Sequence, residues 1–164
     1  MGLLHIYDSS SWFITQTAKR RNAEKKLGIS DMSDLRYELD QLKKAGKFFD
    51  RILFETHGEP GKIFFNHVAI DKYYWEDIPR GRYNSLTATS ARIYFNGCNV
   101  AEGTAGWKFL EAVVPVFMTT GDGEVFGQTS IGFANYDTGH TVHYWGNTRT
   151  LYVKDGNIVQ KSEK

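Results

Sequence analysis

Apolar residues along the chain follow two spacings, and each spacing predicts a different element. Between residues 33 and 46 they recur at steps of four and three, which predicts one face of an amphipathic helix. These residues are Leu35, Leu39 and Leu42. A polar cap at Ser33 or Asp34 and a stop at Gly46 fit its two ends. Residues 51–56 follow directly and are apolar on both faces, which predicts a buried, parallel strand.

Strand and helix continue to alternate in the rest of the chain. Apolar runs predict strands at residues 3–7 and 91–96, and a candidate strand at 117–120 that ends in a glycine-bounded turn. A helix is expected over residues 104–117. Its apolar face consists of Trp107, Leu110, Val113 and Val114. This alternation is typical of an α/β fold with a mainly parallel sheet.

Three stretches give weaker signals. Residues 16–30 are polar with interspersed alanine and leucine, and we expect a weak helix that Gly28 ends. Residues 59–66 combine a Glu-Pro-Gly turn with a short apolar run, which predicts a small hairpin. Residues 71–90 predict a loop with a turn of helix, whose Tyr-Tyr-Trp cluster packs on the core or, alternatively, lines a binding groove.

Residues 140–164 change to a period of two. Alternating runs at 141–145, 149–153 and 157–160 predict strands, and Asp155-Gly156 is a strong signal for a two-residue hairpin turn. We interpret this region as an antiparallel hairpin appended to the sheet. The whole chain, residues 1–164, is therefore predicted to form a single domain.

Composition excludes several classes of partner. The 20 Lys and Arg residues nearly balance the 19 Asp and Glu residues, so no overall field attracts nucleic acid or an anionic membrane. No apolar run is long enough to span a membrane, and the first residues lack the features of a cleavable secretion signal. We expect a cytoplasmic protein, with export by a route that needs no signal peptide left open. The oligomeric state is also left open.

No cofactor or metal is expected. The single cysteine, Cys98, excludes an internal disulfide, and no Cys/His spacing fits a zinc site. His140 and His143 are three residues apart on an expected strand, so they would point to opposite faces and could not share a metal ion. Glycine-rich nucleotide-binding motifs are absent from the sequence.

His57 and Cys98 each follow an apolar run that predicts a buried strand. Sites in open α/β sheets form at the carboxyl ends of strands, so we expect the two side chains to lie close together. A thiolate can attack a carbonyl carbon, and a neighbouring imidazole can remove and later return the proton. The amides of Gly58 and Cys98 would then converge on an oxyanion. A packing role for a lone cysteine is the alternative that the spacing leaves open.

Two motifs around these residues resemble those of cysteine peptidases with the caspase-like fold. One is His57-Gly-Glu-Pro-Gly61 after an apolar strand, and the other is Gly97-Cys-Asn-Val-Ala-Glu-Gly103 after a second apolar strand. Histidine precedes cysteine, as in that group. The chain is most similar to a caspase-like domain of unknown function in long bacterial repeat and adhesin-like proteins. The similarity covers about residues 50 to 130.

The resemblance implies a three-layer sandwich with a mainly parallel sheet. It implies that His57 is the general base and acid, that Cys98 is the nucleophile, and that the Gly58 and Cys98 amides form the oxyanion hole. The expected function is a cysteine hydrolase, in the first place an endopeptidase that acts through an acyl-enzyme on a protein or peptide, as a bacterial effector or regulatory protease. Two alternatives stay open: an inactive protein-binding module of the same fold, and a cysteine amidase or transferase.

Specificity in such enzymes is expected near the strand after the catalytic helix. Asp122 follows the candidate strand at 117–120, and its carboxylate would favour Arg or Lys next to the scissile bond. An ordinary turn aspartate is the alternative. Glu124 is a weaker candidate for the same role. Glu55 lies two residues before His57 and would either orient its ring or be buried in an unrelated pair.

Overall fold

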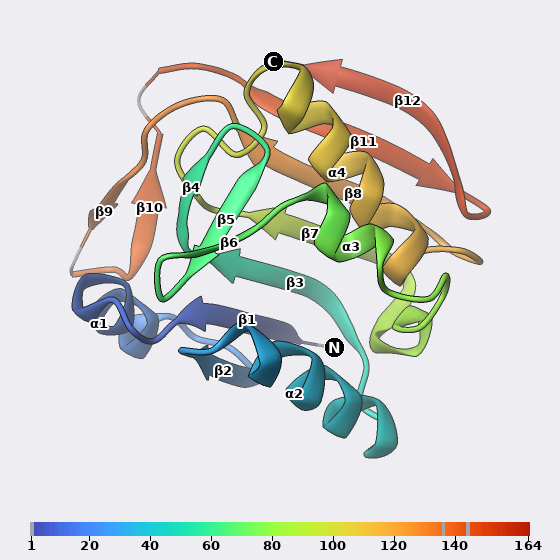
Figure 1. Ribbon diagram of the computed structural model, residues 1–164, viewed down its shortest axis with the longest axis horizontal. Helices are drawn as coiled ribbons and strands as arrows, with labels where there is room; N and C mark the ends of the chain where they lie inside the picture. The colour runs from blue at the N-terminus through green and yellow to red at the C-terminus, as the bar shows by residue number, and fades with distance from the viewer. Residues whose placement is uncertain (1, 136, 144) are drawn as a thin grey trace.

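The computed structural model describes residues 2–135, 137–143 and 145–164. It is a mixed α/β fold with a large, mainly parallel sheet and an antiparallel hairpin at one edge, which confirms the expected fold class (Figure 1). The large sheet has the order β12-β11-β8-β7-β3-β1-β2. Its strands are β1 (Leu3–Asp8), β2 (Lys25–Ile29), β3 (Phe49–Glu55), β7 (Thr87–Phe95), β8 (Asp122–Gln128), β11 (Thr148–Lys154) and β12 (Asn157–Glu163). The strands from β2 to β8 are parallel, and β11 and β12 are antiparallel.

The helices cover the two faces of the sheet unequally. They are α1 (Trp12–Arg20), α2 (Met32–Lys44), α3 (Lys72–Glu76) and α4 (Gly103–Phe117), with a 3₁₀ turn η1 (Asn84–Leu86). The chain moves outward from β1 to β2 through α1 and then in the opposite direction to β3, β7 and β8. Right-handed crossovers therefore place α1 on one face and α2, α3 and α4 on the other, where Figure 1 shows them. Because α1 is the only described helix on the second face, the three-layer arrangement stays a prediction.

An aromatic cluster fills the space between the sheet and its three helices. Trp75 of α3 is fully buried, and its ring centroid lies 5.8 Å from that of Phe54, 6.2 Å from Phe95 and 6.3 Å from Phe109. These edge-on contacts bring together β3, β7 and α4. Trp75 thus holds α3 against the core. This agrees with the packing interpretation of the Tyr-Tyr-Trp cluster in residues 71–90.

α2 follows its sequence signals closely. Its three periodic leucines are buried, and Gly46 beyond its end has the left-handed φ of 68° that glycine adopts at helix ends. The N-terminal cap of α2 is Asp31, two residues before Ser33, the first of the two expected caps. Asp31 accepts a hydrogen bond from the Ser33 amide, 2.9 Å away.

Two expected elements are wrong. α1 ends at Arg20, and Lys25–Ile29 form the edge strand β2 instead of the end of a weak helix. Only Leu27 and Ile29 of β2 are buried, so this strand lacks a continuous apolar run. The strand expected at 117–120 is also wrong, because α4 continues to Phe117 and β8 begins only at Asp122. Two glycines inside β8, Gly123 and Gly127, and Gly121 just before it disguise this strand, since glycine is uncommon in strands.

The chain after β8 builds two hairpins. β11 and β12 are joined by Asp155 and Gly156, whose φ angles of 50° and 78° fit the expected two-residue turn, and β11 pairs with β8 at the sheet edge. β9 (Phe133–Asn135) pairs with β10 (His140–Val142), which covers only the start of the run expected at 141–145. Tyr144 of that run lies outside the described residues. A third small sheet contains β4 (His57–Glu59), β5 (Lys62–Phe65) and β6 (Val68–Ile70). In the described part of the chain, no helix is both long and apolar enough to cross a membrane.

Candidate functional site

The carboxyl ends of β3 and β7 meet at one edge of the sheet. These strands are parallel neighbours, and Phe54 lies opposite Phe95 in their register. His57 and Cys98 each come three residues later, so both lie just beyond this edge. The expectation that the two parallel strands deliver them to the same region is confirmed.

The backbones that carry His57 and Cys98 are in close contact. A Cβ added to Gly58 would lie 2.7 Å from the Cys98 carbonyl oxygen and 3.1 Å from its amide nitrogen. A Cβ on Gly97 would lie 3.3 Å from the Gly58 Cα. Glycine at position 58 is therefore required by the close approach of the two strand ends.

The β4–β5 hairpin interlocks with the chain after Cys98. The Gly61 amide donates a 2.9 Å hydrogen bond to the Val100 carbonyl oxygen, and Gly61 adopts a φ of 72° that favours glycine. A two-residue turn makes Glu59 and Lys62 the closing hydrogen-bonded pair. Alternation along an antiparallel ladder then makes Gly58 and Ile63 a pair without mutual hydrogen bonds. The Gly58 amide accordingly points away from β5, on the side where an oxyanion could accept from it.

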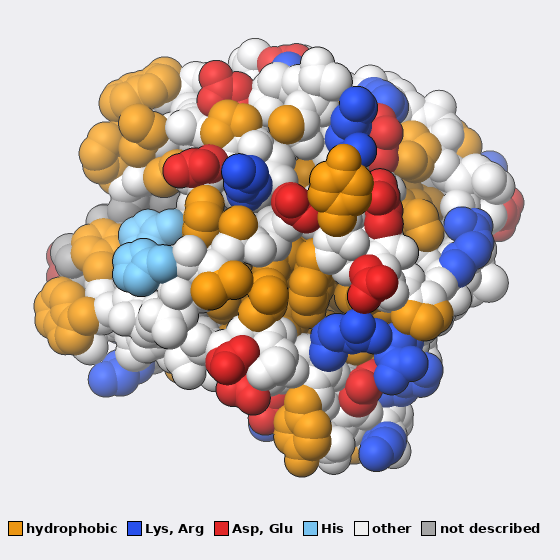
Figure 2. Space-filling model, in the orientation of Figure 1, with side chains coloured by type: hydrophobic (Ala, Val, Ile, Leu, Met, Phe, Trp, Pro, Cys, Tyr) orange, Lys and Arg blue, Asp and Glu red, His pale blue; other side chains and the backbone are white. Residues whose placement is uncertain are grey.

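A pocket of about 90 Å³ contains both candidate residues. Its walls come from α1, the ends of β3 and β7, and the segment around β10. The lining residues are Phe13, Ile14, Thr17, Glu55, Thr56, His57, Asn96, Cys98, Gly132, Thr141 and His143. His57 is exposed and Cys98 is half-buried, so a substrate can reach the imidazole and the thiol. Figure 2 shows histidine side chains exposed together in the region between β10 and β4 of Figure 1.

His143 is a member of the pocket that the sequence did not indicate. Its Nε2 donates to Asn96 Oδ1 at 3.1 Å, and its Nδ1 lies 3.3 Å from the Ser130 hydroxyl and 3.2 Å from the Ser130 carbonyl oxygen. Burial lowers the pKa of His143 below its ordinary value, so the neutral ring is favoured and the Ser130 hydroxyl can donate to Nδ1. Both nitrogens are thus engaged, whereas no residue that the structure describes hydrogen-bonds the ring of His57. His57 is the better placed of the two to exchange a proton.

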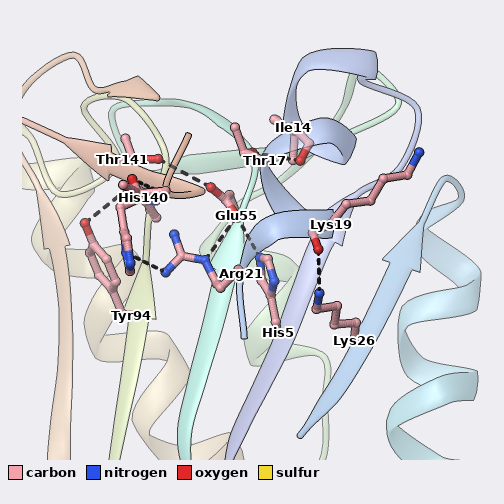
Figure 3. Close-up of polar contacts among 12 residues, drawn as sticks. His5, Ile14, Thr17, Lys19, Arg21, Lys26, Glu55, Tyr94, His140 and Thr141 are labelled. Atoms are coloured by element: carbon pink, nitrogen blue, oxygen red, sulfur yellow. Dashed lines mark hydrogen bonds and ion pairs between the residues drawn. The ribbon is translucent and has the colours of Figure 1, made fainter. Parts of the chain in front are cut away.

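Glu55 lines the pocket and is almost completely buried, and Figure 3 shows its polar contacts. His5 donates from Nε2 to Glu55 Oε2 at 2.7 Å, Thr141 donates to Oε1 at 3.3 Å, and Arg21 Nε lies 3.7 Å from Oε2. Burial lowers the pKa of His5, so its ring is neutral and Arg21 supplies the positive charge opposite Glu55. Glu55 makes none of its hydrogen bonds to His57, which favours the interpretation of a buried, paired carboxylate over a role in orienting that ring.

Asp122 and Glu124 lie away from this pocket. Asp122 begins β8 instead of following a strand, and it lies opposite Ser90, about 16 Å before the carboxyl end of β7 at roughly 3.3 Å per residue. It accepts a hydrogen bond from the Asp155 amide and so supports the β11–β12 turn. Glu124 pairs with Arg92 at 3.0 Å on the open face of the sheet. The expected position of Asp122 beside the site is wrong, and the turn alternative is favoured.

Other candidate sites carry less chemistry. Among the described residues, no group of three metal-ligating side chains comes together. A larger hollow of about 500 Å³ lies between α3 and α4, but its lining, which includes Lys72, Glu111 and Pro115, contains no cysteine, histidine, serine or threonine. The smaller pocket at Cys98 is therefore the candidate active site despite its size.

No family model, curated protein or solved structure matches this chain. The relationship to caspase-like peptidases consequently rests on the two sequence motifs and stays a prediction.

Proposed function

We propose that the chain is a cysteine hydrolase in which Cys98 is the nucleophile and His57 the general base and acid. The observation that carries this proposal is that both side chains line one pocket at the carboxyl edge of a parallel sheet. The caspase-like motifs and their His-before-Cys order support the same assignment. A peptide bond is the substrate that the resemblance favours, which makes the chain an endopeptidase.

The reaction would proceed through an acyl-enzyme. His57 takes the proton from the Cys98 thiol, and the sulfur attacks the carbonyl carbon, which places a negative charge on the carbonyl oxygen. The Gly58 and Cys98 amides would donate to that oxyanion. The carbon–nitrogen bond then breaks as His57 donates its proton to the leaving amine. Water, deprotonated by His57, then attacks the thioester carbonyl carbon, the carbon–sulfur bond breaks, and His57 returns the proton to the Cys98 sulfur.

Alkylation of the thiol tests the assignment directly. Iodoacetamide at about pH 7 should label Cys98 rapidly, with the modified residue located by mass spectrometry, and His57→Ala should slow labelling by at least about tenfold. A matched control is His67→Asn, because His67 is an exposed histidine of the β5–β6 turn with a φ of 64°, which asparagine tolerates. This control should leave the rate unchanged.

Slow labelling that His57→Ala does not alter would contradict the enzyme proposal and favour an inactive binding module. Rapid, His57-dependent labelling without cleavage of peptides would favour the amidase or transferase alternative. Profiling peptide, acyl and glycan amides with the same two variants separates these outcomes. Turnover of a genuine substrate must be lost in His57→Ala and kept in His67→Asn.

A further inference from the structure

We propose that Glu55 is a positioning residue that holds the pocket wall beside Cys98 and so restricts the pocket to a short, uncharged substrate side chain. The wall belongs to a segment that leaves β8 and returns to β11, which we call the arm: residues 129–135, 137–143 and 145–147. This inference rests on the proposed function, because it names the substrate side chain that would lie next to the bond cleaved at Cys98.

Polar contacts attach the arm to the sheet edge at two places. Thr141 of β10 donates to Glu55 Oε1 at 3.3 Å, and His143 donates to Asn96 Oδ1 at 3.1 Å. Arg21 at the end of α1 lies 3.7 Å from Glu55 and 3.5 Å from Nδ1 of His140, the residue before Thr141, so it connects Glu55 to β10 (Figure 3). Glu55 is thus the buried acceptor at which β1, α1 and the arm meet.

The large apolar side chains that the structure describes in the arm lie outside the buried core. Several of them are well exposed, from 42% to 58%. They are Ile131, Phe133, Val142 and Trp145. Such low burial is typical of segments that open at low cost in free energy. The position of the arm over the pocket therefore depends on polar contacts, which include those of Thr141 and His143 at the sheet edge and the 3.0 Å hydrogen bond from the Asn99 amide to the Ser130 carbonyl oxygen.

The pocket that the arm borders is small. Its volume of about 90 Å³ is smaller than that of an engineered protein cavity of about 150 Å³ that binds benzene. A short side chain such as that of alanine, serine or asparagine fits this space, whereas phenylalanine or arginine requires the wall to move.

The charge that Glu55 brings to the pocket is already balanced. Glu55 is the carboxylate that lines it; Arg21 and the neutral His5 lie at its Oε2, and Thr141 donates to its Oε1. The cationic side chain of a substrate Arg or Lys would lie beside Arg21, which already pairs with Glu55. Repulsion from Arg21 would then offset most of its attraction to the Glu55 carboxylate. The pocket thus disfavours the basic side chains that Asp122 was expected to select.

Peptidyl chloromethyl ketones that differ only in the residue next to the reactive group test this inference. We expect Cys98 of the unmodified chain to react at least about tenfold faster with alanine, serine or asparagine probes than with arginine, lysine or phenylalanine probes. Thr141→Val removes the hydrogen bond to Glu55 and should reduce this ratio several-fold, chiefly by accelerating the phenylalanine probe. Thr141→Ser keeps the hydroxyl and should preserve the ratio.

Glu55→Gln should relax the same selectivity, and Asp137→Ala serves as the control. Asp137 belongs to the arm, but its side chain is 98% exposed and its ion pair with Arg20 is 3.8 Å long, so the ratio should not change. A loss of folding alone would lower all rates together and leave the ratio intact. If Glu55→Gln fails to fold, the two Thr141 variants decide the question.

Preference for arginine, lysine or phenylalanine in the unmodified chain would overturn the inference, as would a ratio that Thr141→Val leaves unchanged. Iodoacetamide needs no side-chain pocket, so its His57-dependent reaction reports on the proposed function separately. Rapid iodoacetamide labelling with the wrong probe preference refutes the pocket assignment while the Cys–His assignment stands. Labelling independent of His57 refutes the assignment of function itself.

Discussion

Gly58→Ala is predicted to separate the two backbones that carry the candidate nucleophile and base. The added Cβ would lie 2.5 Å from Val100 Cγ2 and 2.7 Å from the Cys98 carbonyl oxygen. Carbon atoms in contact are normally about 3.5 to 4.0 Å apart, so the overlap with Val100 is about 1 Å or more. Val100 can rotate, but the Cys98 carbonyl belongs to the backbone, and its displacement moves the thiol.

The magnitude follows from this overlap. Overpacking of a closely packed site costs about 1 to 3 kcal/mol, which corresponds to a drop in Tm of about 2 to 12 °C for a chain of this size. A displacement of about 1 Å at reacting atoms can cost about 100-fold in rate, so His57-dependent labelling of Cys98 should fall by one to two orders of magnitude. The reduction in labelling should therefore be larger than the loss of stability alone would produce.

Thermal unfolding and iodoacetamide labelling measure the two effects on the same samples. Gly121→Ala is a matched control, because a Cβ there would approach Thr89 O no closer than 3.5 Å, an ordinary contact. It should shift the free energy of unfolding by less than about 0.5 kcal/mol. If Gly58→Ala behaves like Gly121→Ala in both measurements, the close contact between the strand ends does not exist as described.

Two further predictions concern stability. Burial lowers the pKa of His5 and of His143, so near pH 6.5 the unfolded chain binds protons that the folded chain does not. The contribution of the two neutral rings to the free energy of unfolding is therefore present above about pH 6.5 and is lost as the pH falls below that value. The urea midpoint should drop between about pH 7.5 and 5.5, and less in His143→Asn; an unchanged midpoint would contradict the burial of both rings. Asp40→Ala removes a carboxylate that accepts two hydrogen bonds from Arg82, at 3.0 and 3.2 Å, and should cost about 1 kcal/mol in denaturant unfolding. Asp77→Ala, at an 83% exposed side chain, should cost much less, and equal effects would refute the assigned strength of the Asp40 pair.

The sequence predicted those parts of the protein in which local pattern and tertiary burial agree. α2 has a continuous apolar face that packs on the sheet, and β3 is buried on both faces, so both show the periodicity of their secondary structure. The same agreement predicted that His57 and Cys98 follow neighbouring parallel strands. The two-residue turn at Asp155 and Gly156 was readable because its left-handed φ angles demand particular residues.

Only the tertiary structure decided which other groups reach the site. β2 and β8 were missed because an edge strand and a glycine-rich strand are stabilised by their neighbours in the sheet and carry little local signal. Because β8 begins at Asp122, this residue lies at the amino ends of the parallel strands, opposite the end that carries His57 and Cys98. Glu55 on β3 and His143 on the arm lie 88 residues apart in the sequence, and no spacing rule connects them. Hydrogen bonds from the arm to Glu55 and Asn96 bring His143 into the pocket that Glu55 and Cys98 line. Local pattern thus determined the strands that carry the candidate reactive residues, and long-range contacts determined the pocket around them.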